Sequence, residues 1–531
     1  MSQQSSQFNK AGSRRAFLRT GGSLAAAVTA LRADTPAATP GPLQAGPNIY
    51  ESIGVRPVIN CRGTFTIISG SLTLPEVKRA MDEASRHYVH LDELMDGVGK
   101  RLAKITGAEW GIVTAGCAAG ITHVTSACIA GADPERMQRL PKLHGLKNEV
   151  IIPHGSRNVY DHAVRMTGVT VIEPKTMAEY EAAFTERTAM VYIMAGRDDE
   201  GPMGTQPLAS VARGKGVPVF VDAAAEILTI PNVHLQRGAS VVGYSGGKCL
   251  RGPQCAGLLL GDKNLLQAAW ANSAPHHAFG RSLKVGKEEI MGMLAAVEMW
   301  TKRDHKAEWA QWEAWLGHIS SRVTGIQGVT AEVREPDEGL SNRCPVLHIQ
   351  WDGSRLGITG QEVSGVLFDS EPRIAIAGGR GSRPDKMESS VSIVPYMMMP
   401  GDEKIAAERL YQVLTKPPKF ESPVVPTGEP ANVAGAWEAE VEFLRGSAHH
   451  RIVLEQHGAE LVGTHEAEIL FGNLHGAVTA QQVEFRATHR YEGTHLSYEF
   501  SGKVHGDAME GRVNLGEYGE ARWTAKRHSY A

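Results

Sequence analysis

A lysine lies in a glycine-rich turn between two short apolar runs, in the stretch VVGYSGGKCLRGPQCAGLLLG that covers residues 241–261. Apolar runs of this length, bounded by turn residues, predict a buried strand on each side of Lys248. Burial disfavours the ammonium form and lowers the pKa of a lysine, which suits an amine that attacks a carbonyl and forms a Schiff base. The same position also suits a lysine whose side chain extends out of a loop to water.

A carboxylate lies upstream of this lysine, at the end of another apolar run. Asp222 follows residues 218–221 and precedes Lys248 by 26 residues, which is room for one helix and one strand. Ligands of open α/β sheets bind beyond the carboxyl ends of the strands, so a parallel crossover of this size would bring both side chains to one edge. The alternative role for Asp222 is to cap the next helix.

A run of small residues is the third candidate element. Residues 114–120 (TAGCAAG) follow a predicted strand and open a helix that we expect to reach about residue 130. Such a turn lets backbone N–H groups approach an anion at the positive end of the helix dipole, although small residues also permit close helix–sheet packing. Together, an anion cradle, a buried carboxylate and a buried lysine are what pyridoxal 5′-phosphate needs for its phosphate, its pyridine nitrogen and its imine.

On these stretches the chain resembles the fold-type I pyridoxal-phosphate enzymes of the selenocysteine synthase (L-seryl-tRNA selenium transferase) superfamily, on the side of the D-glucosaminate-6-phosphate ammonia-lyase-like branch. The resemblance covers roughly residues 48–415, and its S-G-x-K…G-P-Q stretch is the most specific part. It implies an α/β fold of the pyridoxal-phosphate-dependent transferase (aspartate aminotransferase-like) type and a homodimer or higher homo-oligomer. The matching segments are Ile59–Asn60 with Gly63–Thr64, Thr106–Glu109, Ala115–Ala119, Val221–Glu226, and Tyr244–Lys248 with Gly252–Gln254.

The resemblance also implies roles for individual residues. Lys248 would bind the cofactor and later act as acid and base at the substrate Cα, while Asp222 would pair with the pyridine nitrogen. His154 matches a region that supplies a ring-stacking residue, and a surface histidine in a turn is the alternative. The residues expected at the phosphate are Ser245, Gly116, Cys117 and Ala118, and the candidates for the substrate carboxylate are Arg373, which also suits a structural salt bridge, and Arg62.

Two departures from the family pattern limit what can be transferred. The chain has no basic N-terminal domain and a net charge of −3, so we expect neither a tRNA substrate nor any other nucleic-acid partner. Residues 65–70 replace a run that shapes the substrate pocket in the family, so the identity of the substrate cannot be transferred.

From the resemblance we predict a lyase that performs α,β-elimination on a small-molecule amine, an amino acid or amino sugar acid. Transamination or β-replacement is the alternative, and a ligand- or surface-binding protein on a catalytically silent scaffold is the second one.

Hydrophobic patterning predicts the elements that position these residues. Strand-like runs alternate with helical ones from about residue 55 to 300, which favours a mostly parallel sheet covered on both faces. A helical stretch over about 284–322 leads into a smaller α+β segment, and period-two alternation near the C-terminus predicts an antiparallel β-barrel-like domain. The predicted boundaries are 1–33 (signal region), 34–48 (linker), 49–300 (cofactor-binding large domain), 301–415 (small α+β domain), 416–432 (Pro-rich linker) and 433–531 (barrel-like domain).

The N-terminus predicts the location of the protein. Residues 13–19 (SRRAFLR) precede a weakly apolar stretch over 21–31, a pattern typical of twin-arginine export signals. We therefore expect the twin-arginine machinery as a partner and a periplasmic or otherwise exported protein.

The remaining features carry weaker expectations. Six scattered cysteines without a C-x-x-C pair predict buried thiols, and no metal site is predicted. The many histidines after residue 433 have no ligand spacing, so we expect them to be solvated. Because the Pro-rich linker has few means of holding two domains rigidly, we expect a chain ending near Lys416 to fold, bind cofactor and exchange the α-proton.

Overall fold

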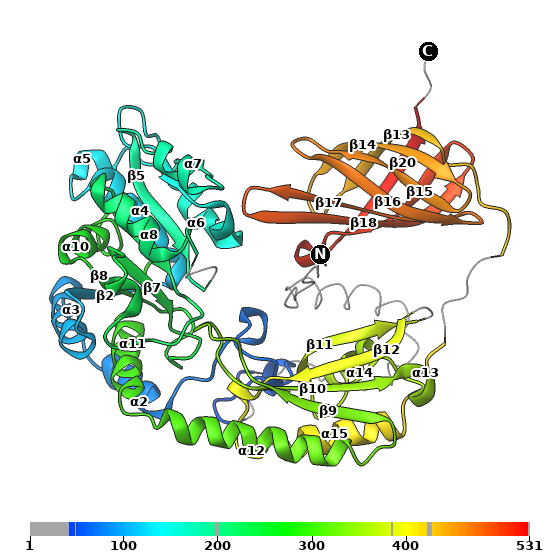
Figure 1. Cartoon of the computed structure of the whole chain (residues 1–531), viewed down its shortest axis with the longest axis horizontal. Coiled ribbons are helices and arrows are strands. Elements are labelled where there is room, and N and C mark those ends of the chain that lie inside the picture. Colours follow the sequence, from blue (N-terminus) through cyan, green and yellow to red (C-terminus); the bar gives the residue numbers. More distant parts are fainter. Residues whose placement is uncertain (1–41, 48, 197–200, 384–385, 422–426, 529–531) are drawn as a thin grey trace, which may run out of the picture.

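The chain forms a large α/β unit, a smaller α+β unit and a β-barrel, each around its own hydrophobic core (Figure 1). The computed structural model describes residues 42–528 except 48, 197–200, 384–385 and 422–426. The predicted twin-arginine region and most of the first linker lie outside the described residues. Within the described part of the chain, no helix is long and apolar enough to cross a membrane.

A seven-stranded sheet forms the centre of the large unit. Its interior strand Thr188–Met194 is buried along almost its whole length, as expected for a parallel strand covered on both faces. The strand Gly257–Gly261 runs antiparallel to both neighbours, and the other adjacent strands run parallel. This confirms the predicted mostly parallel sheet. The spatial order is β2 (Trp110–Thr114), β8 (Gly257–Gly261), β7 (Val241–Ser245), β6 (Val219–Asp222), β5 (Thr188–Met194), β3 (Glu149–Ile151) and β4 (Thr170–Ile172).

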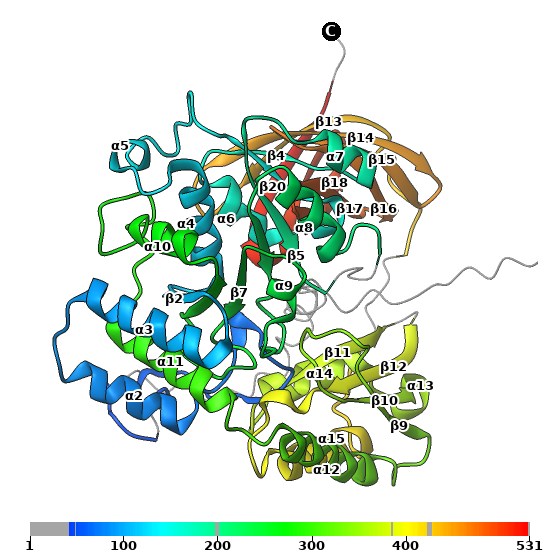
Figure 2. The ribbon, with the colours of Figure 1, turned by 60° about the vertical axis from the view of Figure 1, so that its left-hand side comes forward.

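Helices cover this sheet, as Figure 2 shows from a second direction. The helix Cys117–Ala130 contacts five strands and buries twelve of its fourteen residues, because apart from His123 its sequence is apolar or small all round. The helices are α2 (Pro75–Ser85), α3 (Leu91–Thr106), α4 (Cys117–Ala130), α5 (Pro134–Met137), α6 (His162–Arg165), α7 (Met177–Ala182), α8 (Thr205–Gly214), α9 (Val233–Gln236), α10 (Lys263–Ala271) and α11 (Lys287–Trp300), with 3₁₀ turns η1 (Glu51–Ile53), η2 (Thr66–Ile68), η3 (His154–Ser156) and η4 (Val159–Asp161).

The small unit contains a five-stranded sheet with helices packed on it. The predicted helical stretch over 284–322 is two helices, because the Asp304 side chain accepts the Ala307 N–H at 3.0 Å and starts a new one. Residues 59–61 fall within the predicted large domain but form the first strand of this sheet. The elements are, in sheet order, β1 (Ile59–Cys61), β11 (Ile374–Ser382), β12 (Lys386–Ile393), β10 (Val346–Asp352) and β9 (Val329–Arg334), with α12 (His305–Val323), α13 (Gly353–Leu356), α14 (Gly360–Asp369), η5 (Pro395–Met397) and α15 (Asp402–Thr415).

The C-terminal unit is a closed barrel of eight antiparallel strands, which confirms the predicted barrel. Buried and exposed residues alternate along its strands, and the buried set includes Trp437, Trp523 and Phe500. The strands are β13 (Gly435–Glu442), β14 (Ser447–His457), β15 (Glu460–Glu466), β16 (Phe471–Thr479), β17 (Gln482–Tyr491), β18 (Thr494–His505), β19 (Ala508–Asn514) and β20 (Glu520–Arg527), with η6 (Gly516–Tyr518) before the last.

Three histidines line up inside this barrel, contrary to the prediction that its histidines are solvated. His450 Nδ1 lies 2.8 Å from His465 Nε2, and His465 Nδ1 lies 2.8 Å from His489 Nε2. All three are buried, because they occupy inward positions of the alternating strands. The prediction is right for exposed histidines such as His449 and His475. Among the described residues no cluster of His, Cys, Asp or Glu is arranged to hold a metal ion.

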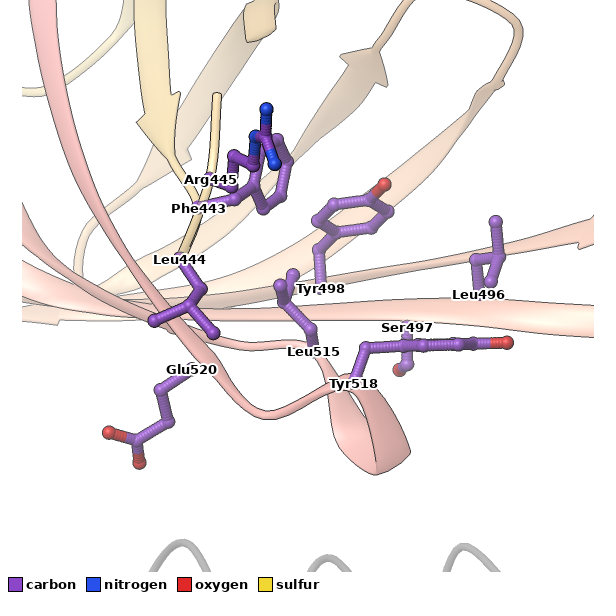
Figure 3. Close-up of a pocket in the computed structure, with 9 residues that line it drawn as sticks. All are labelled: Phe443, Leu444, Arg445, Leu496, Ser497, Tyr498, Leu515, Tyr518 and Glu520. Atoms are coloured by element: carbon purple, nitrogen blue, oxygen red, sulfur yellow. The ribbon is translucent and has the colours of Figure 1, made fainter. Parts of the chain in front are cut away.

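A pocket of about 340 Å³ opens at one end of the barrel (Figure 3). Tyr498 on β18 lies both in this pocket and against the rings of the three histidines. The turn 443–445 and the β19–β20 connection supply most of the remaining lining. The lining residues are Phe443, Leu444, Arg445, Leu496, Ser497, Tyr498, Leu515, Tyr518 and Glu520.

Candidate active site

Four loops meet at the carboxyl edge of the large sheet. Asp222 ends β6, the turn with Lys248 follows β7, the small-residue turn follows β2, and the segment from His154 follows β3. Strands β3, β6 and β7 belong to one parallel set, so the chain leaves all of them on the same side. The fold therefore brings the predicted lysine, carboxylate and cradle to one edge.

Asp222 is held by hydrogen-bond donors at both carboxylate oxygens and is only 2% exposed. The Tyr192 hydroxyl donates to Oδ2 at 2.7 Å, and the Ala224 N–H donates to Oδ1 at 3.1 Å. The Cys117 thiol contacts Oδ1 at 3.6 Å. A buried carboxylate fixed by donors on two sides can present a steady negative charge to a cationic group.

Burial keeps the neighbours of Asp222 in their protonated, hydrogen-bonding forms. Burial and the adjacent Asp222 charge raise the pKa of the Tyr192 hydroxyl well above its ordinary value. The same two causes raise the pKa of the Cys117 thiol, and the charge of Lys248 opposes that rise. Both neighbours of Asp222 therefore remain donors at neutral pH.

The turn with Lys248 is built of closely packed backbone. The Gly246 N–H donates to the Ala256 carbonyl at 2.8 Å, and a Cβ on Gly247 would lie 2.7 Å from Gln254 Cα. Only glycine fits at these positions, which explains the Gly-Gly pair before the lysine. Lys248 itself is half-buried, as is Ser245 at the end of β7.

The small-residue turn has the form of an anion cradle. Gly116 is the N-cap residue of α4 and has a φ of 90°, so no side chain caps the start of this helix. The first turn of the helix contains no acidic residue. The leading N–H groups of a helix have no carbonyl partner within it, so those of Cys117 and Ala118 are available to an anion. Ala118 is exposed, and a Cβ on Gly257 of β8 would lie 2.4 Å from the Gly116 carbonyl carbon.

The two candidate arginines lie at opposite ends of one strand pair. Strands β1 and β11 run parallel, with Ile59 beside Ile374 and Cys61 beside Ile376. Arg373 precedes this pair and Arg62 follows it, so the structure does not bring them together.

Arg62 lies in the segment that packs on the Lys248 turn. In this segment the Ser71 N–H donates to the Gly247 carbonyl at 3.0 Å. Arg62 is 8% exposed, and burial lowers its pKa to about 10. Arg373 instead donates from Nε to the Phe368 carbonyl at 2.9 Å and stacks on the Phe368 ring. Arg62 likewise stacks on the ring of Phe65, so both arginines make structural contacts, and Arg62 is the one in the segment that reaches the Lys248 turn.

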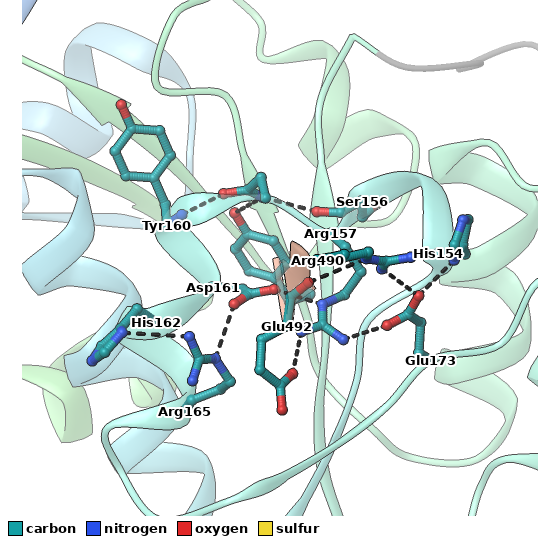
Figure 4. Close-up of polar contacts among 12 residues, drawn as sticks. His154, Ser156, Arg157, Tyr160, Asp161, His162, Arg165, Glu173, Arg490 and Glu492 are labelled. Atoms are coloured by element: carbon teal, nitrogen blue, oxygen red, sulfur yellow. Dashed lines mark hydrogen bonds and ion pairs between the residues drawn. The ribbon is translucent and has the colours of Figure 1, made fainter. Parts of the chain in front are cut away.

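His154 lies in a network of charged side chains after β3 (Figure 4). Its Nδ1 lies 2.5 Å from Glu173 Oε1, and its side chain is 44% exposed. Glu173 also pairs with Arg157 and with Arg490 of the barrel. His154 is thus more constrained than a solvent-facing histidine in a turn.

The arrangement agrees with comparisons to known proteins, although no family model matches the chain. D-glucosaminate-6-phosphate ammonia lyase of Salmonella typhimurium is 29% identical over 336 residues, which are 61% of this chain and 88% of that protein. The 5′-C-glycyluridine monooxygenase-decarboxylase of a Streptomyces species is 31% identical over 307 residues, which are 55% of this chain and 74% of that protein. The chain belongs to the selenocysteine synthase-like family of pyridoxal-phosphate enzymes.

Two further comparisons show how much of the chain the family accounts for. L-seryl-tRNA(Sec) selenium transferase of Proteus mirabilis is 24% identical over 285 residues, and the chain covers 58% of that protein. The solved structure of D-glucosaminate-6-phosphate ammonia-lyase superposes with a TM-score of 0.61 at 27% identity, covering 69% of this chain and 98% of that one. The family fold, of the aspartate aminotransferase-like type, thus accounts for a share about the size of residues 49–415.

The residues at the sheet edge fit the cofactor of this family. Pyridoxal 5′-phosphate requires an amine, an anion at its pyridine nitrogen and a phosphate cradle. Lys248, the donor-held carboxylate of Asp222 and the uncapped start of α4 are residues that could supply these three groups. This member of the selenocysteine synthase-like family is a pyridoxal-phosphate-dependent enzyme.

Sequence reasoning missed the support behind Asp222. Asn158 donates from Nδ2 to the Tyr192 hydroxyl at 3.1 Å, and that hydroxyl donates to Asp222. One signal was available, because a tyrosine inside the otherwise apolar strand over 188–194 needs a buried acceptor. The contact of the barrel with the His154 network had no such local signal.

Proposed function

We propose that the protein catalyses α,β-elimination with release of ammonia from an amino acid or amino sugar acid. The observation that carries this proposal is the buried, donor-held Asp222 at the same sheet edge as Lys248. The relative named as an ammonia lyase, similar over 88% of its own length, supports elimination as the outcome and an amino sugar acid as the substrate class.

The side chains have distinct tasks in such a reaction. Pyridoxal 5′-phosphate, when bound, supplies the electron sink that stabilises negative charge at the substrate Cα. Asp222 holds the proton on the pyridine nitrogen, and the Tyr192 and Cys117 donors keep its carboxylate in place. Lys248 would hold the cofactor and would act as the base that removes the proton from the substrate Cα. Arg62 binds the substrate carboxylate.

The first experiment locates the cofactor. Borohydride treatment of the purified protein followed by peptide mass spectrometry should place the reduced cofactor on Lys248. A Lys248→Ala variant should retain neither this adduct nor turnover. An adduct on another lysine would overturn the assignment.

The second experiment defines the reaction. Amino acids and amino sugar acids that change the visible spectrum of the bound cofactor should release ammonia and a keto product in equal amounts. A keto product without free ammonia would indicate transamination, and retention of the amine with exchange of the β-substituent would indicate replacement. No spectral change with any amine would favour the catalytically silent scaffold.

We also propose that the protein is exported by the twin-arginine route and acts as a homodimer. The SRRAFLR sequence and the apolar stretch after it support export, and the family supports self-association. Replacement of Arg14 and Arg15 by lysine should keep the protein in the cytoplasm, as fractionation would show. Light scattering of the purified protein should give twice the chain mass.

A further inference from the structure

We infer that the β17–β18 hairpin of the barrel is a positioning element of the cofactor site. This hairpin, residues 490–494, contacts the segment over 154–161 that carries His154 and Asn158. The barrel would therefore complete the catalytic unit instead of serving only as an accessory domain. The inference rests on the proposed roles of Asp222 and His154.

Charged side chains join the hairpin to the large unit (Figure 4). Arg490 Nη2 lies 2.7 Å from Glu173 Oε1, and Glu492 pairs with Arg157. Arg157 also pairs with Asp161. The side chain of Arg157 is 5% exposed and that of Asp161 is 1% exposed. Glu492 is one of three carboxylate partners of this buried guanidinium, so undocking the hairpin would leave Arg157 less well compensated, and the network favours the docked hairpin.

Backbone contact at the hairpin tip is equally close. A Cβ on Gly493 would lie 2.0 Å from the Asn158 carbonyl oxygen and 2.4 Å from Asp161 Oδ2. Glycine at this position lets the two backbone segments touch, and any side chain would push the hairpin away. The contact is therefore built at the level of the backbone as well as through charge.

Two routes of direct contacts lead from the hairpin to the candidate active site. In the first, Arg490 pairs with Glu173, which binds His154. In the second, Gly493 packs on Asn158, whose side chain donates to Tyr192, and Tyr192 donates to Asp222. The hairpin thus reaches the groups proposed for the face and the nitrogen of the cofactor ring through one or two intermediaries.

The test compares full-length variants by cofactor binding. Arg490→Ala removes the barrel partner of Glu173, Gly493→Ala pushes the hairpin away without changing charge, and Arg490→Lys retains the charge. Each apoprotein is titrated with pyridoxal 5′-phosphate, and the visible band of the bound cofactor is followed from pH 5 to 9. Matched controls are Arg451→Ala, whose Glu438 partner lies 4.0 Å away on the barrel surface, and Gly317→Ala, where a Cβ meets nothing.

The expected result separates positioning from folding. Arg490→Ala and Gly493→Ala should raise the cofactor dissociation constant by about tenfold, the effect of one charged hydrogen bond, and shift the midpoint of the pH titration. Arg490→Lys should have a dissociation constant and a titration midpoint close to those of the wild type, and the control variants should match the wild type. Wild-type affinity and midpoint in both disruptive variants would overturn the inference, while a wild type without cofactor on Lys248 would overturn the proposed function instead.

Discussion

At the scale of single residues, the site depends on how Asp222 is held. Its two oxygens accept from Tyr192 and from the backbone of Ala224, and it is 2% exposed. A residue that only capped a helix would not need a tyrosine donor from a neighbouring strand. The structure therefore favours the charge-pairing role for Asp222 over the capping role.

Asp222→Asn tests this role directly. The amide preserves the shape of the side chain but removes the charge that keeps the pyridine nitrogen protonated, so turnover should fall by about a hundredfold or more while cofactor stays bound. Steady-state kinetics and the absorbance of bound cofactor measure both effects. Asp262→Asn is the control, because Asp262 caps α10 through the Leu265 N–H at 2.7 Å. Equal activity of the two variants would show that Asp222, like Asp262, has only a capping role.

At the scale of elements, the start of α4 offers a prediction about phosphate. Ala118 is exposed in the first turn of that helix, so a charged side chain there should not disturb the fold. Ala118→Asp should weaken binding of pyridoxal 5′-phosphate by about tenfold or more, through repulsion at the cradle. Binding of pyridoxal, which lacks the phosphate, should change little in the same titration. Ala118→Ser provides the uncharged control, and equal losses for both ligands would exclude the cradle.

A row of buried histidines makes the barrel sensitive to acid. Burial lowers the pKa of His450 to about 4 and that of His465 to about 3, against about 6.5 in the unfolded chain. The unfolded state therefore takes up protons first as the pH falls below about 6.5, and the folded barrel loses stability down to about pH 4. The slope should reach about 1.4 kcal/mol per pH unit for each histidine.

Urea unfolding of the separately produced barrel, residues 427–531, at pH 7, 6 and 5, followed by the fluorescence of its two tryptophans, Trp437 and Trp523, measures this slope. His465→Gln should reduce it, and His457→Gln, at an exposed position on the same barrel, should not. A free energy of unfolding that stays constant between pH 7 and 5 would contradict the prediction.

The elements also show what a sequence can and cannot predict. The buried strands on each side of Lys248 and the edge position of Asp222 followed from apolar runs and turn residues. Strands β15, β16 and β19 are harder to recognise in the sequence, because each carries an interior glycine that weakens the strand pattern. These glycines are required by packing: a Cβ on Gly463 would lie 1.8 Å from the Val453 carbonyl oxygen, and one on Gly511 would lie 1.9 Å from that of Ser501.

At the scale of the whole molecule, long-range contacts decide what local patterns leave open. Nothing near residue 490 in the sequence indicates that Arg490 pairs with Glu173, which lies 317 residues away. The register of β1 on β11 likewise places Arg62 and Arg373 at opposite ends of one strand pair, which neither local motif reveals. The composition of the linker predicted independent units, and the structure adds a contact between them that the linker does not reveal.

That contact divides the expectation for a chain ending near Lys416 into two parts. The large and small units have their own cores, separate from the barrel core, so the shortened chain should fold and remain soluble. It also retains Lys248, Asp222 and the cradle, so it should still bind cofactor. Without the hairpin, however, Arg157 and Glu173 lose their barrel partners, and the segment that carries His154 loses its outer support.

We therefore expect the shortened chain to bind pyridoxal 5′-phosphate about tenfold more weakly than the full chain and to exchange the substrate α-proton more slowly. Calorimetric titration and exchange in deuterated water measure the two effects. Separately produced barrel, residues 427–531, added in excess should restore part of the lost affinity, and barrel with Gly493→Ala should not. Full affinity and exchange in the shortened chain would show that the barrel serves another purpose, such as recognition of a large substrate, because the hairpin would then contribute nothing that the cofactor site requires.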